Sequence, residues 1–101
     1  MVTIRIGDSE RTMRDATEGW ITEQVRRQRT NGNVVCVQVT VKTDDLDLVA
    51  ATVNCPRIGG SRQPRPHEAR IFELWHDRGM DDPKFGPGNL IAFLKQLERL
   101  I

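Results

Sequence analysis

Two cysteines and two histidines are the side chains of this sequence with the most versatile chemistry. A zinc site would use Cys36, Cys55, His67 and His76, but their spacings are wide and irregular and include no Cys-x-x-Cys pair. A nucleophilic cysteine needs an electropositive, partly exposed setting, which Cys55 beside an arginine-rich stretch offers better than Cys36 among valines. The simpler interpretation is two structural thiols and two surface histidines. We therefore expect no metal, no cofactor and no catalytic residue.

Three acidic side chains cluster at Asp44, Asp45 and Asp47. Aspartates are ordinary turn formers, so a hairpin turn at this point accounts for them. No carboxylate lies inside an apolar run, where a raised pKa would indicate catalysis. The pair Gly59-Gly60 lacks the Gly-Lys-Ser/Thr ending of a phosphate-binding loop. The cluster is predicted to be a non-catalytic acidic patch.

Arginines make up twelve of the fifteen basic residues, and many lie in the stretch "PRIGGSRQPRPHEAR". Arginine suits bidentate contacts with carboxylate or phosphate groups. The candidate surface for an acidic or anionic partner comprises Arg57, Arg62, Arg65 and Arg70, with Arg26, Arg27 and Arg29 at the end of a predicted helix. The basic stretch and the acidic patch could dock on a partner protein or on a second copy of the chain.

The first third of the chain predicts a hairpin of two strands followed by a helix. Residues 2–6 alternate apolar and polar side chains, as in a half-buried strand. Residues 11–15 are predicted to return as the second strand of a hairpin; the alternative is a helix that begins at Ser9. From Thr17, a plausible N-cap, the spacing is helical, and "TNGN" ends the helix.

The middle of the chain predicts a second hairpin, "NVVCVQVTVKT" followed by "LDLVAATVNC". Opposed residues of an antiparallel pair share a face, so we match Val39 with Ala51 and Val41 with Val49. This register places Cys36 and Cys55 on different faces and argues against a disulfide between them. The apolar residues Leu46, Leu48 and Ala50 then lie on the nominally polar face, so part of that face is expected to be covered.

The last third predicts a flexible connector at about residues 56–66 and two helices. Pro66 suits the first position of the first helix, Gly79 and Met80 suit its end, and residues 89–101 form a strongly amphipathic second helix. The predicted order is ββαββαα. This gives one α+β domain over residues 1–101, with an antiparallel or mixed four-stranded sheet, one helix between the two hairpins and a C-terminal helical hairpin.

Composition narrows the function classes. The net charge is +1 and 38% of residues are hydrophobic, which is typical of a globular protein without a general attraction to nucleic acid or membranes. No segment resembles a signal peptide or a membrane span, so we expect a cytoplasmic protein. The leading hypothesis is a non-catalytic protein–protein interaction module, an adaptor, regulatory subunit or bacterial accessory factor, and a homodimer is the simplest form of this hypothesis. The alternative is a nucleic-acid-binding protein that uses the arginine-rich loop.

Overall fold

The computed structural model describes residues 1–32, 34–53, 55 and 65–101. Its strands are β1 (Val2–Ile6), β2 (Ser9–Thr12), β3 (Val37–Lys42) and β4 (Asp47–Ala51), and its helices are α1 (Glu18–Thr30), α2 (Pro66–Asp77) and α3 (Pro87–Leu100). The strands form one antiparallel sheet in the order β2-β1-β3-β4. The predicted α+β class and the order ββαββαα are confirmed.

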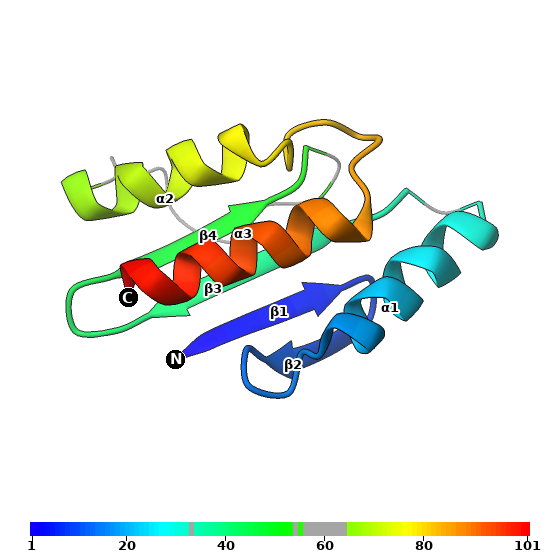
Figure 1. Ribbon diagram of the computed structural model, residues 1–101, viewed down its shortest axis with the longest axis horizontal. Coiled ribbons are helices and arrows are strands. Elements are labelled where there is room, and N and C mark those ends of the chain that lie inside the picture. The colour runs from blue at the N-terminus through cyan, green and yellow to red at the C-terminus, as the bar shows by residue number, and fades with distance from the viewer. Residues whose placement is uncertain (33, 54, 56–64) are drawn as a thin grey trace.

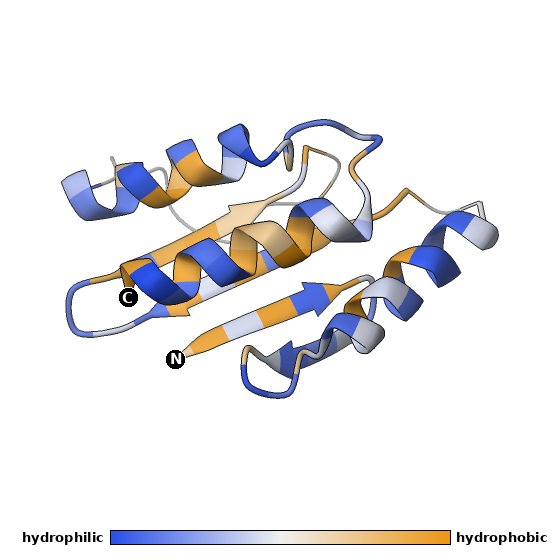
Figure 2. Cartoon of the chain, in the orientation of Figure 1, coloured by the Kyte–Doolittle hydropathy of each residue, from blue (hydrophilic) through white to orange (hydrophobic). Residues whose placement is uncertain are grey.

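The three helices lie on one face of the sheet, with α3 between α1 and α2 (Figure 1). Every second residue of β1, namely Val2, Ile4 and Ile6, is buried against them. On the neighbouring strands, Val37, Val39 and Val41 of β3 and Leu48 and Ala50 of β4 are buried too (Figure 2). Helix α1 accompanies β1 at one flank, and α2 accompanies β4 at the other. The molecule therefore has two different sides, each made of one edge strand and one flanking helix.

The predicted register of the second hairpin is wrong by one residue. Val39 pairs with Ala50 and Val41 pairs with Leu48, instead of Ala51 and Val49. The turn explains the shift, because the Thr43 N–H donates to the Leu46 carbonyl at 2.7 Å and leaves a two-residue loop, Asp44-Asp45. Leu46, Leu48 and Ala50, which the predicted register placed on the nominally polar face, are all buried, whereas Val53 is 67% exposed.

The element ends follow local rules that the sequence predicts well. Thr17 accepts a hydrogen bond from the Trp20 N–H at 3.1 Å and so caps α1. Gly79 has a φ of 77° after α2, and the Met80 N–H donates to the Trp75 carbonyl at 3.1 Å, which completes a Schellman motif. A returning strand follows β1, as predicted, and not the start of a helix, but it covers residues 9–12 instead of the predicted 11–15. Helix α3 starts two residues before the predicted position, at Pro87.

Candidate functional site

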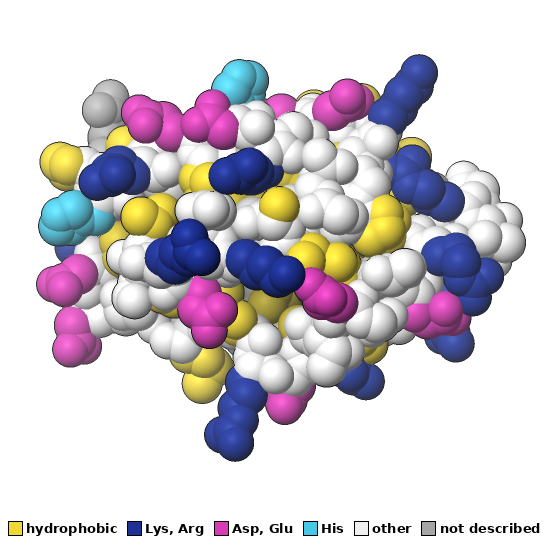
Figure 3. Space-filling view, viewed as in Figure 1, with side chains coloured by type: hydrophobic (Ala, Val, Ile, Leu, Met, Phe, Trp, Pro, Cys, Tyr) yellow, Lys and Arg dark blue, Asp and Glu magenta, His cyan; other side chains and the backbone are white. Residues whose placement is uncertain are grey.

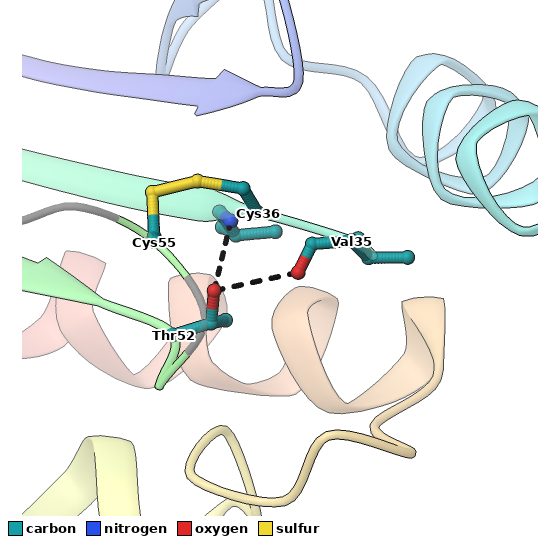
Figure 4. The surroundings of a disulfide bond; sticks show 5 residues. Val35, Cys36, Thr52 and Cys55 are labelled. Carbon is teal, nitrogen blue, oxygen red and sulfur yellow. Dashed lines mark hydrogen bonds between the residues drawn. A yellow bond between two sulfur atoms is a disulfide. The ribbon is translucent and has the colours of Figure 1, made fainter. Parts of the chain in front are cut away.

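The two cysteines are joined in a disulfide, which contradicts the expectation of two thiols. Their Cα atoms lie 4.9 Å apart, at the start of β3 and just beyond the end of β4 (Figure 4). A turn brings them together, because the Cys55 N–H donates to the Thr52 carbonyl at 3.0 Å after the strand has ended. The face of Cys55 is therefore set by the turn and not by the strand register. Disulfides are rare in the cytosol, so this bond does not support the expected cytoplasmic location.

Thr52 holds the same corner from below the disulfide (Figure 4). Its side chain is 4% exposed, accepts a hydrogen bond from the Val37 N–H at 3.2 Å and donates one to the Val35 carbonyl at 3.4 Å. Such a buried hydroxyl satisfies two main-chain groups where the ladder between β3 and β4 ends. The corner is a structural element, and neither cysteine carries a free thiol for nucleophilic chemistry.

The predicted arginine surface divides into residues that have partners and residues that do not. On α1, Arg26 and Arg27 both bind Glu23, with shortest N–O distances of 2.8 and 3.0 Å. The hydrogen bonds from Arg26 first, and then Arg27, lower the pKa of Glu23 below its usual value. Arg29 donates to the Phe85 carbonyl and lies 5.5 Å from the centre of the Phe85 ring. These three arginines serve intramolecular contacts.

The remaining arginines of the predicted surface lie at or before α2. Arg57 and Arg62, with most of the predicted connector, lie outside the described residues. Arg65 and Arg70 are exposed, and their guanidinium groups form no ion pair or hydrogen bond in the part of the chain that is described. The structure thus leaves Arg65 and Arg70 available to a partner.

The predicted acidic patch is a solvent-exposed hairpin turn. Asp44 and Asp45 form its tip, and Asp47 is the first residue of β4. The Asp47 N–H points away from β3 and donates to the carboxylate of Glu68 at 3.1 Å. Glu68 is 1% exposed and also accepts from the Arg65 N–H at 2.9 Å, so it ties the start of α2 to the edge of the sheet.

A groove between α1 and α3 is a candidate binding site that the sequence did not predict. Its volume is about 290 Å³. The lining residues come from the segment before α1, the first turns of α1 and one face of α3: Met13, Ala16, Thr17, Glu18, Ile21, Ile91, Leu94, Lys95 and Glu98. The floor is apolar, and the charged residues stand at the rim. Figure 3 shows apolar side chains between basic and acidic ones on this helical face.

The rim of the groove carries two carboxylates and one ammonium group. Lys95 Nζ lies 2.9 Å from Glu18 Oε1, and the two side chains are 69% and 64% exposed. An ion pair this exposed contributes little to stability and can open at small cost. Glu98 is exposed and has no ion pair within the described residues. The rim therefore attracts positive charge, beside a floor that accepts apolar groups.

One sequence signal did indicate this groove. Ile91 widens the apolar stripe of the last helix beyond a single core-facing side, which is typical of a helix that also meets a partner. Ile91 is half-buried and lines the groove. The sequence does not indicate that Met13 and Ala16 line the same groove, because they come from a segment that is distant from Ile91 in the sequence.

Other site types find no support in the described residues. Over this part of the chain no group of three or more histidine, cysteine or acidic side chains could hold a metal ion. His76 instead bonds to Asp81 at 2.8 Å. None of the described helices is long and apolar enough to cross a membrane. Comparisons with models of known protein families, with curated proteins and with solved structures give no match.

Proposed function

We propose that this protein is a non-catalytic interaction module whose α1–α3 groove receives an apolar side chain of a partner protein. The observation that carries this proposal is the groove itself, with an apolar floor open to solvent and a charged rim. Interfaces concentrate their binding energy where one large side chain fills a pocket surrounded by polar residues. The volume of about 290 Å³ lies below the usual range of cofactor pockets and suits one anchoring side chain.

The charges at the rim define the residues expected beside the anchor. Two carboxylates, Glu18 and Glu98, outnumber the single ammonium group of Lys95. A lysine or arginine next to the anchoring side chain would bind Glu98, or would take Glu18 from Lys95. The expected partner segment therefore combines a bulky apolar residue with a basic neighbour. This occupant is favoured over nucleic acid, because the arginines of α1 already have intramolecular partners.

Selection from a displayed peptide library tests the proposal. Peptides are selected on the native protein and screened against Ile91→Glu, which places a carboxylate in the groove. Arg99→Gln is the matched control, because it changes the net charge by the same amount on an exposed position of α3 that does not line the groove. Circular dichroism establishes that both variants are folded.

The expected result is a set of peptides with a bulky apolar residue beside lysine or arginine. Their affinity should fall at least about tenfold for Ile91→Glu and stay unchanged for Arg99→Gln. Chemical-shift changes on peptide addition should centre on Ala16, Ile91 and Leu94. Peptides that bind both variants equally, or that shift residues elsewhere, would refute the groove as the binding site.

A further inference from the structure

The helix that lines the groove, α3, is followed by exposed apolar side chains. Among the described residues, the large hydrophobic side chains that are exposed belong to Met1, Val34, Val53, Leu100 and Ile101. Of these five, only Leu100 and Ile101 adjoin each other. They come directly after the part of α3 that lines the groove, from Ile91 to Glu98. Adjacent exposed apolar side chains beside a binding groove are typical of a contact with another molecule.

The charges on the α3 rim of the groove are self-complementary. Lys95 and Glu98 are three residues apart, so they share the side of α3 that lines the groove. Both are exposed, and Glu98 has no ion pair within the described residues. When two α3 helices lie antiparallel with these sides together, each Lys95 can face Glu98 of the other copy. The carboxylate of Glu98 on each rim then meets an ammonium group of the other copy.

One register of the two helices satisfies the charges and the apolar residues together. Pairing each Lys95 with Glu98 of the other copy places a two-fold axis between positions 96 and 97 of α3. The same register brings Ile101 level with Ile91 in the groove of the other copy, to within one residue or about 1.5 Å along the helix. Such an arrangement is closed, because each copy provides one apolar segment and receives one.

We propose that the occupant of the α1–α3 groove is a second copy of this chain, which inserts Leu100-Ile101 while the two α3 helices pack antiparallel. This inference rests on the proposed function, because it takes the groove as a binding site and names its partner. Ile101 is the anchoring side chain. It lies beyond the last residue of α3 and is 47% exposed, so it can turn toward the other copy at small cost.

Self-complementarity favours a second copy over an unrelated peptide. The groove calls for a bulky apolar anchor with a basic group near it. In the antiparallel arrangement Ile101 is the anchor, and Lys95 of the same copy is the basic group that faces Glu98. Lys95 has more than one N–H to donate, so it can also keep its bond to Glu18 of its own chain.

Analytical ultracentrifugation from low micromolar to near-millimolar protein tests this inference. The native protein should reach twice the 11.5 kDa chain mass. A segment variant, Leu100→Ser with Ile101→Ser, should keep the chain mass, with association weakened at least about tenfold. Val34→Ser with Val53→Ser is the matched control, because it also replaces two exposed apolar residues and neither lines the groove. The control should associate like the native protein, and circular dichroism establishes that both variants are folded.

Mixing two variants tests the reciprocal exchange. Ile91→Glu blocks the groove and keeps the segment, whereas the segment variant keeps the groove. Neither should associate alone, but the mixture should form a heterodimer in which one of the two exchanges is intact.

Charge exchange on α3 tests the register. Lys95→Glu and Glu98→Lys should each weaken association about fivefold, and the double variant should restore it because opposite charges face each other again. Weakening that the double variant does not reverse would contradict the antiparallel register.

The outcomes separate this inference from the proposed function. A native protein that stays monomeric at the highest concentration overturns the inference, as does a dimer that the segment variant does not weaken. The segment variant should still bind the selected groove peptides, because its groove is intact. If these peptides bind the groove while the native protein is monomeric, the inference fails and the proposed function stands. If Ile91→Glu alters neither peptide binding nor self-association, both fail.

Discussion

The two sides of the molecule are built from the same parts but differ in how many of their polar groups are already bonded. On the β2–α1 side, made of the outer edge of β2 and the exposed residues of α1, Arg26 and Arg27 bind Glu23. At the end of β2, the Thr12 carbonyl accepts from the N–H groups of Asp15 and Ala16. The β2 edge also carries the exposed charges of Glu10 and Arg11.

The β4–α2 side, made of the outer edge of β4 and the exposed residues of α2, has the opposite character. The main-chain groups of Val49 and Ala51 point outward without described partners, and the Arg65 and Arg70 side chains form no described bond. Among the described residues, the buried Glu68 carboxylate bonds the Asp47 N–H of this edge to the Arg65 N–H at the start of α2. Among the described residues, the two sides therefore differ in how far contacts within the chain use their polar groups.

Glu68→Ala is expected to cause the largest loss of stability on the β4–α2 side. It removes a buried carboxylate that accepts from Arg65 and Asp47, and leaves both N–H groups without their acceptor. The free energy of unfolding should fall by about 3 kcal/mol. Urea unfolding at a fixed low protein concentration measures it. Glu10→Ala on the opposite edge is the control and should stay within about 0.5 kcal/mol of the native protein. Equal effects of the two variants would remove the contrast between the edges.

Replacing both cysteines by serine is expected to be nearly as costly. The disulfide closes a loop with a sequence separation of 19. Its loss gives the unfolded chain more conformational freedom and removes the covalent link beyond the end of β4 in the folded state. The free energy of unfolding should fall by about 3 kcal/mol. Reduction of the native protein should lower its free energy of unfolding by the same amount. Reductant should leave the free energy of unfolding of the double variant unchanged. A midpoint that does not respond to reductant would contradict a structural role for this bond.

The disulfide and the hairpin register show where prediction from sequence ended. Thr17, Gly79 and Met80 were assigned correctly because caps depend on neighbours within one helical turn. The register depends on the length of one turn, and placing Asp44 and Asp45 in a two-residue loop would have corrected it. Cys55 depends on a further turn after β4, which the alternation of apolar residues does not report.

The candidate sites were harder to predict for a related reason. The arginine surface was chosen by residue type, and the type does not reveal that Glu23 and Phe85 already engage the arginines of α1. The groove joins Met13 to Ile91 through tertiary packing, so the stripe on the last helix was its one visible sign. The outward direction of the main-chain groups of Val49 and Ala51 leaves no trace in residue types.

Thr52→Val is expected to have an intermediate effect at the disulfide corner. Valine keeps the shape of threonine but loses the hydroxyl that bonds to Val37 and Val35. Because Thr52 is buried, the free energy of unfolding should fall by about 1.5 kcal/mol. Thr12→Val on the β2 edge is the matched substitution; its hydroxyl bonds to Asp15 at an exposed position, so the change should stay below about 0.5 kcal/mol. A larger loss of unfolding free energy for the Thr12 variant than for the Thr52 variant would contradict the contrast between the two edges. It would show that the β2 edge depends more strongly on side-chain hydrogen bonds.

The smallest effect is expected on α1, where replacing Arg26 and Arg27 by glutamine removes both partners of Glu23. The pKa of Glu23 should rise toward its usual value, because the hydrogen bonds that lower it are gone. A carboxyl whose pKa is lowered in the folded state stabilises the fold above its unfolded pKa, and this contribution disappears as the pH falls through the folded pKa. The double variant should therefore be slightly less stable than the native protein at neutral pH and equally stable in strong acid. Nuclear magnetic resonance titration of the Glu23 carboxyl carbon measures the pKa. If Glu23 of the native protein titrates at its usual value, the arginines of the β2–α1 side are as available to a partner as those of α2.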